Sequence, residues 1–291
     1  MMNNEFAHLL SRAESLLARL ENRLPAPVVM PDWSSVIAAR WHKSGFHSVI
    51  HPHKIRLTDL QGIDTQKALI DRNTQQFLKG LPANNVLLWG SRGTGKSSVI
   101  KALLNSYAVK GLRLIEVEPH DLIDLPDIVE SLYQRPERFI LFCDDLSFEK
   151  EDASYKALKS VLDGSVSASP ENVLIYATSN RRHLLPEYLG DNLEAKNVDG
   201  EIHQGDSVEE KISLSERFGL WLSFYPFNQD EYLDIVFYWL RELGIEKLNR
   251  QKTRTAALQW ALMRGSRSGR SAWQFARDWA GQLGLKNKIG K

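Results

Sequence analysis

The residues of this chain best suited to chemistry form a glycine-rich string that runs from 90 to 98. The string reads Gly90-Ser91-Arg92-Gly93-Thr94-Gly95-Lys96-Ser97-Ser98, and its first eight residues match the pattern G-x-x-x-x-G-K-[ST]. In such a loop the glycines let backbone N–H groups surround an anion, the lysine contacts the β- and γ-phosphates, and the hydroxyl binds Mg²⁺. The string therefore predicts a nucleotide-phosphate site with Lys96 as its cation and Ser97 as a metal ligand.

Two further polar groups follow apolar stretches that read as strands. Asp144 and Asp145 follow the apolar stretch 139–143, and Asn180 lies just beyond the stretch 173–177. The carboxyl ends of buried parallel strands face the ligand crevice of an α/β sheet. We expect Asp144 to complete the Mg²⁺ site, Asp145 to orient or deprotonate a water, and Asn180 to hold that water or contact the γ-phosphate.

Short apolar runs separated by helix-length stretches must position these groups. The strand candidates are Val86 to Trp89, Leu112 to Val117, Phe139 to Cys143, Val173 to Ala177 and Leu220 to Tyr225. Their spacing of about 25 to 45 residues fits strand–helix–strand crossovers, so we predict an α/β domain with a five-stranded parallel sheet flanked by helices.

The two ends of the chain follow other patterns. Apolar residues recur at helical spacing from Phe6 to Leu24, which predicts a helix that either docks on its own domain or pairs in a coiled coil. Residues 25 to 57 contain four prolines and read as an irregular arm. Asn228 and Glu231 can form a capping box that opens a helical segment. We expect an N-terminal helix and arm at 1–57, an α/β domain at 58–226 and a small all-α domain at 227–291.

Composition bounds the class of protein that can carry this chemistry. Of 291 residues, 43% are hydrophobic and 25% charged, which is typical of a globular chain. The net charge of +1 gives no overall attraction to nucleic acid or membranes. The single cysteine, Cys143, lies in an apolar run and is predicted to be a core residue. No signal-peptide pattern opens the chain, and no apolar run reaches the roughly 20 residues of a spanning helix, so we expect a cytoplasmic protein without membrane partners.

Two local features leave alternatives open. Residues 264–291 carry seven basic residues against one acidic, whereas residues 181–216 carry nine acidic residues against four basic. The basic tail can be a solvated helix face, an interface with the acidic segment of another copy, or, with Trp273 and Trp279 among its arginines, a nucleic-acid contact. Four histidines, His42, His47, His51 and His53, can be drawn as a zinc site, but no cysteine or clear carboxylate accompanies them, which favours surface histidines.

With the three polar elements in this order, the sequence resembles the AAA+ ATPases. It is more closely similar to DUF815, a bacterial family of predicted AAA+ ATPases of unknown function. The resemblance runs from about Ala38 to Gly281. It is carried by the strings LTDLQGIDTQK (57–67), PANNVLLWGSRGTGKSS (82–98), FILFCDDLSFE (139–149), NVLIYATSNRRHLLPE (172–187), EEKISLSERFGLWLSFYPF (209–227) and the Gly-Arg-Ser helix start at 269–271.

This resemblance implies roles for residues outside the loop. Gly62 and Ile63 would border the adenine, and Asn180 would be the residue called sensor 1. Arg217 matches the place from which many AAA+ proteins send an arginine finger into a neighbour's site, although it also reads as an ordinary surface ion-pair residue. Arg270 is the expected sensor 2 arginine; Arg267 is the alternate, and an exposed tail cation is the plainer reading.

The sequence departs from the common AAA+ pattern at Asp145, where most relatives carry glutamate. Its carboxylate is one methylene shorter, so we expect slow hydrolysis or a contribution from Glu149. The predicted function is ATP and Mg²⁺ binding with slow hydrolysis, in a protein whose ATP state controls homo-oligomer assembly or the conformation of a protein partner. The alternatives are a nucleic-acid-directed loader or helicase accessory, and a phosphoryl-transferase.

Overall fold

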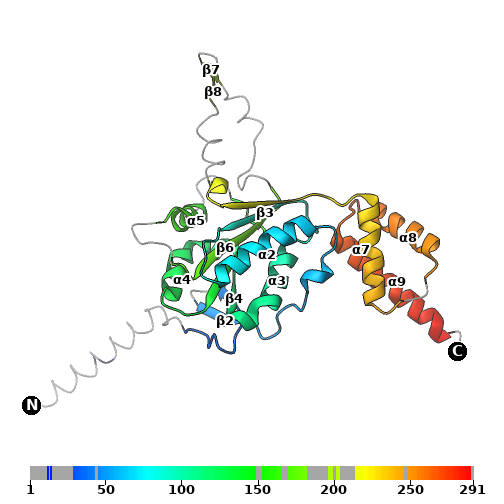
Figure 1. Ribbon diagram of the computed structural model, residues 1–291, viewed down its shortest axis with the longest axis horizontal. Helices are drawn as coiled ribbons and strands as arrows, with labels where there is room; N and C mark the ends of the chain where they lie inside the picture. The colour runs from blue at the N-terminus through cyan, green and yellow to red at the C-terminus, as the bar shows by residue number, and fades with distance from the viewer. Residues whose placement is uncertain are drawn as a thin grey trace, which may run out of the picture.

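The computed structural model in Figure 1 describes most of the chain. The described residues are 12, 14, 29–42, 45–148, 153–164, 170–181, 196–198, 201–203, 214–245 and 248–289. The apolar stripe of the predicted N-terminal helix, Glu149 and most of the acidic segment 181–216 lie outside these residues. No helix within the described ranges is long and apolar enough to cross a membrane.

The architecture is a mostly parallel sheet with helices on both faces and further helices at the C-terminal end (Figure 1). The strands in chain order are β1 (Ala38–His42), β2 (Gly45–Ser48), β3 (Val86–Gly90), β4 (Leu112–Val117), β5 (Arg138–Cys143), β6 (Val173–Ser179) and β9 (Leu220–Phe224). They lie in the order β2-β1-β4-β5-β6-β3-β9, and every neighbouring pair is parallel except β1 and β2. Two short strands, β7 (Lys196–Val198) and β8 (Glu201–His203), form a separate antiparallel pair.

The sheet corrects two expectations from the sequence. All five predicted strands are present and adjacent, but β1 and β2 extend the sheet to seven strands, so the arm at 25–57 is not irregular throughout. Strand β1 was missed because polar Arg40 and His42 interrupt a run of only five residues. Its Trp41 is nonetheless buried, and its backbone pairs with β4, which the local sequence pattern does not reveal.

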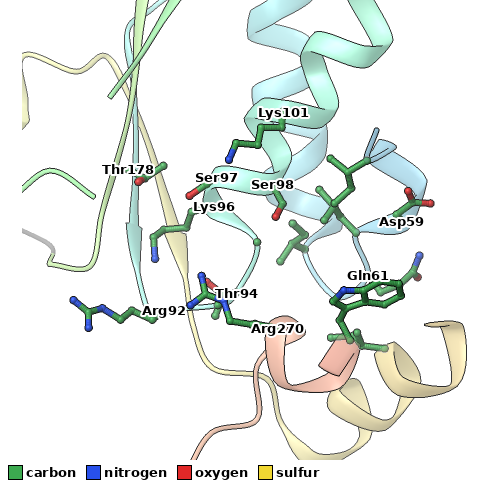
Figure 2. A pocket seen from close by; sticks show the side chains of 18 of the residues that line it. Asp59, Gln61, Arg92, Thr94, Lys96, Ser97, Ser98, Lys101, Thr178 and Arg270 are labelled. Carbon is green, nitrogen blue, oxygen red and sulfur yellow. The ribbon is translucent and has the colours of Figure 1, made fainter. Parts of the chain in front are cut away.

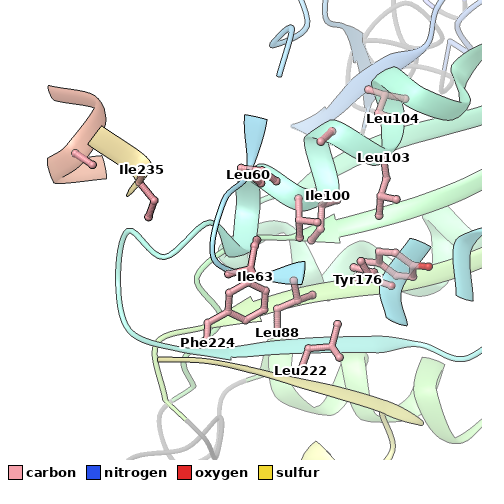
Figure 3. Packing of buried hydrophobic residues seen from close by; sticks show 14 of the residues in the cluster. Leu60, Ile63, Leu88, Ile100, Leu103, Leu104, Tyr176, Leu222, Phe224 and Ile235 are labelled. Atoms are coloured by element: carbon pink, nitrogen blue, oxygen red, sulfur yellow. The ribbon is translucent and has the colours of Figure 1, made fainter. Parts of the chain in front are cut away.

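Both faces of the sheet are covered, which explains why its strands read as continuous apolar runs. The helices of this layered domain are α2 (Asp64–Leu78), α3 (Lys96–Tyr107), α4 (Leu125–Leu132) and α5 (Ala153–Asp163), with 3₁₀ turns η1 (Leu57–Asp59), η2 (Ala108–Lys110) and η3 (Pro119–Asp124). Leu88 of β3 packs with Ile100 of α3 in the cluster of Figure 3, whereas its neighbour Leu87 packs with Ile128 and Leu158 on the opposite face.

A buried polar contact fixes α2 against the middle of the sheet. The Tyr176 hydroxyl of β6 lies 3.0 Å from Asn73 Nδ2, which donates to it, and 2.9 Å from Thr74 Oγ1. Burial raises the pKa of Tyr176 to about 12, because the ionised phenolate would lose its hydration. The neutral hydroxyl therefore holds α2 in place. Residues 59–63, which directly precede α2, reach the pocket described below.

The C-terminal helices are α7 (Gln229–Glu242), α8 (Arg250–Met263) and α9 (Gly269–Ile289). The predicted capping box is confirmed: Asn228 Oδ1 accepts from the Glu231 N–H, and the Asn228 N–H donates to Glu231 Oε2 at 2.8 Å. Helix α7 packs along α9, and Ile235 of α7 joins the cluster that contains Leu60 and Ile63 (Figure 3). This packing places the C-terminal helices against the carboxyl end of β3.

Candidate nucleotide-binding site

The glycine-rich string forms the turn between β3 and α3. Gly90 has φ of 124°, and a Cβ there would lie only 2.1 Å from the carbonyl oxygen of Phe224. The Ser91 N–H donates to that same oxygen at 2.9 Å, so β9 approaches the loop too closely for any side chain at 90. Gly95 precedes the first turn of α3 with φ of 106°, in the left-handed region that glycine enters readily. The loop therefore presents its N–H groups at a helix N-terminus, the usual setting for phosphate binding.

Lys96 lies buried at the first turn of α3, with only 7% of its surface exposed. Its Nζ donates to the carbonyl oxygens of Gly90 and Ser91, both at 2.8 Å, and to Asn180 Oδ1 at 3.2 Å. Burial lowers the pKa of Lys96, and the carboxylates of Asp145 and Asp144 partly oppose that shift. The ammonium group thus sits beside the loop, held by acceptors that a phosphate oxygen can replace.

Asp144, at the end of β5, gathers two hydroxyl groups. Ser97 Oγ and Thr178 Oγ1 each donate to Asp144 Oδ1 at 2.6 Å. The pairing of Cys143 with Ala177 in the parallel strands β5 and β6 brings Asp144 beside Thr178. Mg²⁺ prefers oxygen ligands, so this donor set fits a Mg²⁺ ion held by Ser97 and Asp144.

Asp145 has an unusual backbone for a non-glycine residue. Its φ is 54°, and its N–H donates to Thr178 Oγ1 at 2.8 Å. The Asn180 amide donates to Asp145 Oδ1, and Arg92 Nη2 lies 4.0 Å from the other carboxylate oxygen. The Asp145 side chain is 60% exposed, so water reaches the carboxylate. The two residues expected to handle the attacking water therefore contact one another.

These groups line one pocket of about 850 Å³. Of the residues expected from the sequence to bind nucleotide or Mg²⁺ or to act in hydrolysis, those in its lining are Ile63, Arg92, Gly93, Thr94, Gly95, Lys96, Ser97, Ser98, Asp144, Asp145, Asn180 and Arg270. Figure 2 shows Arg270 reaching from α9 toward the loop, with Asp59 and Gln61 on the far side of Ser98 from Thr178. Gly62 is not a lining residue, but it packs against Phe227, which is. A Cβ on Gly62 would lie only 2.9 Å from the Phe227 ring.

Two arginines named from the sequence lie elsewhere in the described chain. The Arg217 guanidinium donates to Asp163 of α5, its side chain is 22% exposed, and it is not part of the pocket lining. Arg267 is likewise not a lining residue; its backbone carbonyl accepts from the Phe227 N–H at 3.3 Å. Between the two candidates on the C-terminal helices, the pocket therefore contains Arg270.

The lining also contains residues that the sequence reasoning did not assign to this site, chief among them Asp59, Gln61, Lys101, Thr178, Trp239 and Trp273. The ring centroids of Trp239 and Trp273 are 4.5 Å apart, so α7 and α9 together supply an aromatic wall. Trp273 follows Arg270 by one helical turn, a spacing that would have placed both side chains on one face. Nothing local to Trp239 would have revealed its position.

The pocket rim is tied to α7 by a set of polar contacts around Asp59. Tyr238 donates to Asp59 Oδ1 at 2.8 Å, and Arg56 contacts both Asp59 at 2.6 Å and Glu242 at 2.7 Å. Burial alone would raise the pKa of Asp59, but the hydrogen bonds from Arg56 and Tyr238 outweigh burial and lower it. Asp59 is therefore charged and held in place at neutral pH.

The C-terminal helices also contact the loop directly. The Arg270 N–H donates to the Gly93 carbonyl at 3.2 Å. A Cβ on Gly93 would lie 3.0 Å from Ser268 Oγ, and one on Gly269 would lie 3.3 Å from the Gly93 oxygen. The start of α9 and the middle of the loop thus pack closely, and a Cβ at either glycine would force its neighbour to move slightly.

Nearby aromatic residues of the basic tail are engaged within the chain. Trp279 stacks on Phe275 with ring centroids 5.4 Å apart, and Arg277 lies 5.8 Å from the ring centroid of Trp273. Arg264 lies over Trp260 at 4.8 Å. The tryptophans that suggested a nucleic-acid contact therefore pack inside the helical domain or line the pocket.

The strand order, the loop after β3 and the C-terminal helices define the class: the chain has the fold of an AAA+ domain with a helical lid, as in RuvB. A single-substitution variant of Thermotoga maritima RuvB has 16% identity and a TM-score of 0.53, over 80% of this chain and 66% of that one. A chain of the Escherichia coli MS115-1 HORMA:CdnC:Trip13 complex has 13% identity and a TM-score of 0.50, over 77% and 90%. This chain spans just under two thirds of the RuvB chain, and identities this low concern the fold alone.

The particular family is defined by residues 34–283, which match the family described as "Protein of unknown function (DUF815)". The match covers most of the chain, so the protein belongs to the DUF815 family. No curated protein matches the sequence.

Proposed function

We propose that this protein binds ATP with Mg²⁺ and hydrolyses it slowly, so that its nucleotide state controls assembly of copies or the conformation of a partner. One observation carries the proposal: a single pocket brings together a buried lysine on a glycine loop, a hydroxyl–carboxylate pair and a water-accessible carboxylate. That set can bind phosphates, hold a divalent cation and orient a water. The AAA+ fold supports the nucleotide-binding part of this proposal.

The protein's own groups divide the work among three parts of the pocket. Backbone N–H groups of the loop bind the phosphates, and Lys96 transfers its hydrogen bonds from the Gly90 and Ser91 carbonyls to phosphate oxygens. Ser97 and Asp144 would hold Mg²⁺, which supplies neutralisation of phosphate charge when bound. Asp145 accepts the proton of the attacking water, and Asn180 keeps that carboxylate oriented.

We expect slow turnover because the Asp145 side chain is short and is hydrogen-bonded to Asn180. A general base must lie within about 2.6–3.2 Å of the proton it accepts, and a misplacement near 1 Å reduces the rate about 100-fold. Aspartate reaches one methylene less far than glutamate, and the contact with Asn180 restrains it further. We therefore expect an enzyme that remains in its ATP state for long periods.

Replacing Asp145 by asparagine tests this assignment. We expect turnover to fall about 100-fold while ATP affinity is unchanged, because the amide keeps the volume of the side chain but cannot accept the proton. Asparagine also tolerates the left-handed backbone found at this position. Single-turnover hydrolysis at saturating ATP measures the effect; a fully active variant would exclude Asp145 as the base and direct attention to Glu149.

Trp273 tests how the nucleobase is held. Stacking of a base on an aromatic ring contributes about 1–3 kcal/mol, so Trp273→Ala should weaken ATP binding by about 10-fold or more. Calorimetric titration with ATP and with tripolyphosphate separates the base from the phosphates, and Trp273→Phe is the control that keeps a ring. Equal losses of affinity for the two ligands would contradict a stacking role.

The overall proposal is tested by assaying the tag-free protein for release of inorganic phosphate with Mg²⁺ and with EDTA. We expect Mg²⁺-dependent release, equal in amount to the ADP formed and without any added acceptor. ADP formed only when an acceptor is supplied would instead indicate a phosphoryl-transferase. A nucleic-acid role is not advanced, because the tail tryptophans are engaged within the helical domain or at the pocket.

A further inference from the structure

A second group of ligand-type side chains lies at the carboxyl edge of the sheet, well separated from β3 in the strand order. It consists of His42 at the end of β1 and of His120 and Asp121 in η3. Asp121 Oδ2 lies 3.5 Å from His42 Nδ1 and 3.4 Å from His120 Nε2. All three ligand atoms fall within 4.8 Å of one another. None of these residues belongs to the nucleotide pocket.

The fold holds these side chains together through well-buried neighbours. Strands β1 and β4 are parallel, with Trp41 paired to Val117, so the residues that follow each strand emerge side by side. Trp41 is 1% exposed, and its indole N–H donates to Asp124 Oδ2 of η3 at 2.9 Å. The core residue next to His42 thus fixes the segment that carries His120 and Asp121.

Asp121 gives an independent indication of a ligand. Its side chain is 13% exposed, and its Oδ2 atom is shielded from solvent without a hydrogen-bond partner among the described residues. Buried carboxylate oxygens without a donor are rare, because the lost hydration is not replaced. This oxygen faces the two imidazole nitrogens, the direction in which a shared cation would lie.

We propose that His42, His120 and Asp121 bind a Zn²⁺ ion, with a fourth position left for water or an exogenous ligand. Zinc bonds to histidine nitrogen and carboxylate oxygen are about 2.0–2.2 Å long, so two donors of one tetrahedral ion lie about 3.3–3.5 Å apart. The separations of Asp121 Oδ2 from His120 Nε2 (3.4 Å) and from His42 Nδ1 (3.5 Å) match that edge. Two imidazoles with one carboxylate suit zinc, whereas Mg²⁺ takes oxygen ligands.

An outer carboxylate supports the same assignment. His120 Nδ1, the nitrogen that faces away from Asp121, lies 3.7 Å from Glu118 Oε2. Metal-binding histidines commonly direct their second nitrogen to such a carboxylate, which orients the ring. The sequence reasoning favoured surface histidines because no carboxylate accompanied the His42 cluster; the fold supplies one from Asp121. Of that cluster, His53 instead lines the nucleotide pocket.

Zinc binding is tested on the full-length, tag-free protein after treatment with EDTA and dialysis. A Zn²⁺ titration in competition with a chromogenic chelator should show one tight site per chain. Asp121→Asn and His42→Ala should each abolish that site, whereas His51→Ala, which alters an exposed histidine outside the group, should retain it. Glu118→Gln should weaken Zn²⁺ binding about 10-fold, as expected for an outer partner of a ligand.

Two measurements guard against variants that merely misfold. Melting in EDTA should give the same midpoint for wild type, Asp121→Asn and His42→Ala, and Zn²⁺ should raise the midpoint of the wild type alone. Co²⁺ added to the wild type should give the intense visible absorption of a tetrahedral site. Equal zinc affinity in wild type and Asp121→Asn, or only the weak spectrum of octahedral Co²⁺, would overturn the proposal.

Discussion

Lys96→Ala should reduce ATP turnover by about 100- to 1,000-fold, the range observed when one preorganised donor to developing charge is removed. The structure gives the physical reason. The ammonium is buried beside the loop and held by the Gly90 and Ser91 carbonyls, so it is positioned before the phosphate arrives. Alanine leaves no cation at this position, and nucleotide binding should weaken together with turnover.

The control for Lys96→Ala is Lys79→Ala, which removes the same charge at the end of α2, outside the pocket lining. Turnover by the Lys79 variant should equal that of the wild type. Phosphate release is measured at several ATP concentrations, and circular dichroism checks that the buried substitution has not unfolded the chain. Unchanged turnover in a folded Lys96→Ala variant would contradict the proposed active site.

The second large effect concerns Arg217, for which we propose a role in the pocket of a neighbouring copy within an ATP-bound homo-oligomer. Arg217→Ala should lower turnover about 10³-fold, as loss of an arginine finger does. A mixture of Arg217→Ala and Lys96→Ala should regain part of the activity that neither has alone. Mixed interfaces can combine an intact loop from one copy with an intact arginine from the other, and activity should rise with protein concentration.

The ion pair between Arg217 and Asp163 provides a matched control. If Arg217 only stabilises its own chain through that contact, Asp163→Asn should lower turnover as much as Arg217→Ala. If Arg217 acts on a neighbour, Asp163→Asn should keep its activity, because this substitution retains the Arg217 guanidinium. If activity does not depend on protein concentration and the mixture does not recover activity, Arg217 is an ordinary surface ion-pair residue and not an arginine finger.

The sequence predicted the fold class and five strands because each strand is an apolar run, and Asp144, Asp145 and Asn180 follow two of these runs closely. The parallel register then explains why Asp145 and Asn180 are in contact, since β5 and β6 end at the same edge. Strand β1 could not be predicted, because its stability comes from pairing with β4 and from burial of Trp41. Its neighbour β2 pairs with β1.

The same distinction applies to the candidate site. The loop residues were predictable because one contiguous motif sets their roles. Trp239 and Asp59 were not, because they reach the pocket only through packing of α7 against distant segments of the chain. The link between Tyr238 and Asp59 joins residues 179 positions apart, and no local pattern encodes such a contact.

The backbone contact between Gly93 and Arg270 has a thermodynamic consequence. The start of α9 contacts the glycine-rich loop. A ligand that moves the loop therefore changes the relative free energies of the positions that the helical domain can adopt. Linkage is reciprocal: a partner that holds α7–α9 in one position must change ATP affinity by the same factor by which ATP changes affinity for that partner. A coupling free energy of about 1–3 kcal/mol corresponds to a factor of about 5–150. Under the proposed function, the position of the helical domain can therefore be controlled either by nucleotide or by a partner that binds its helices.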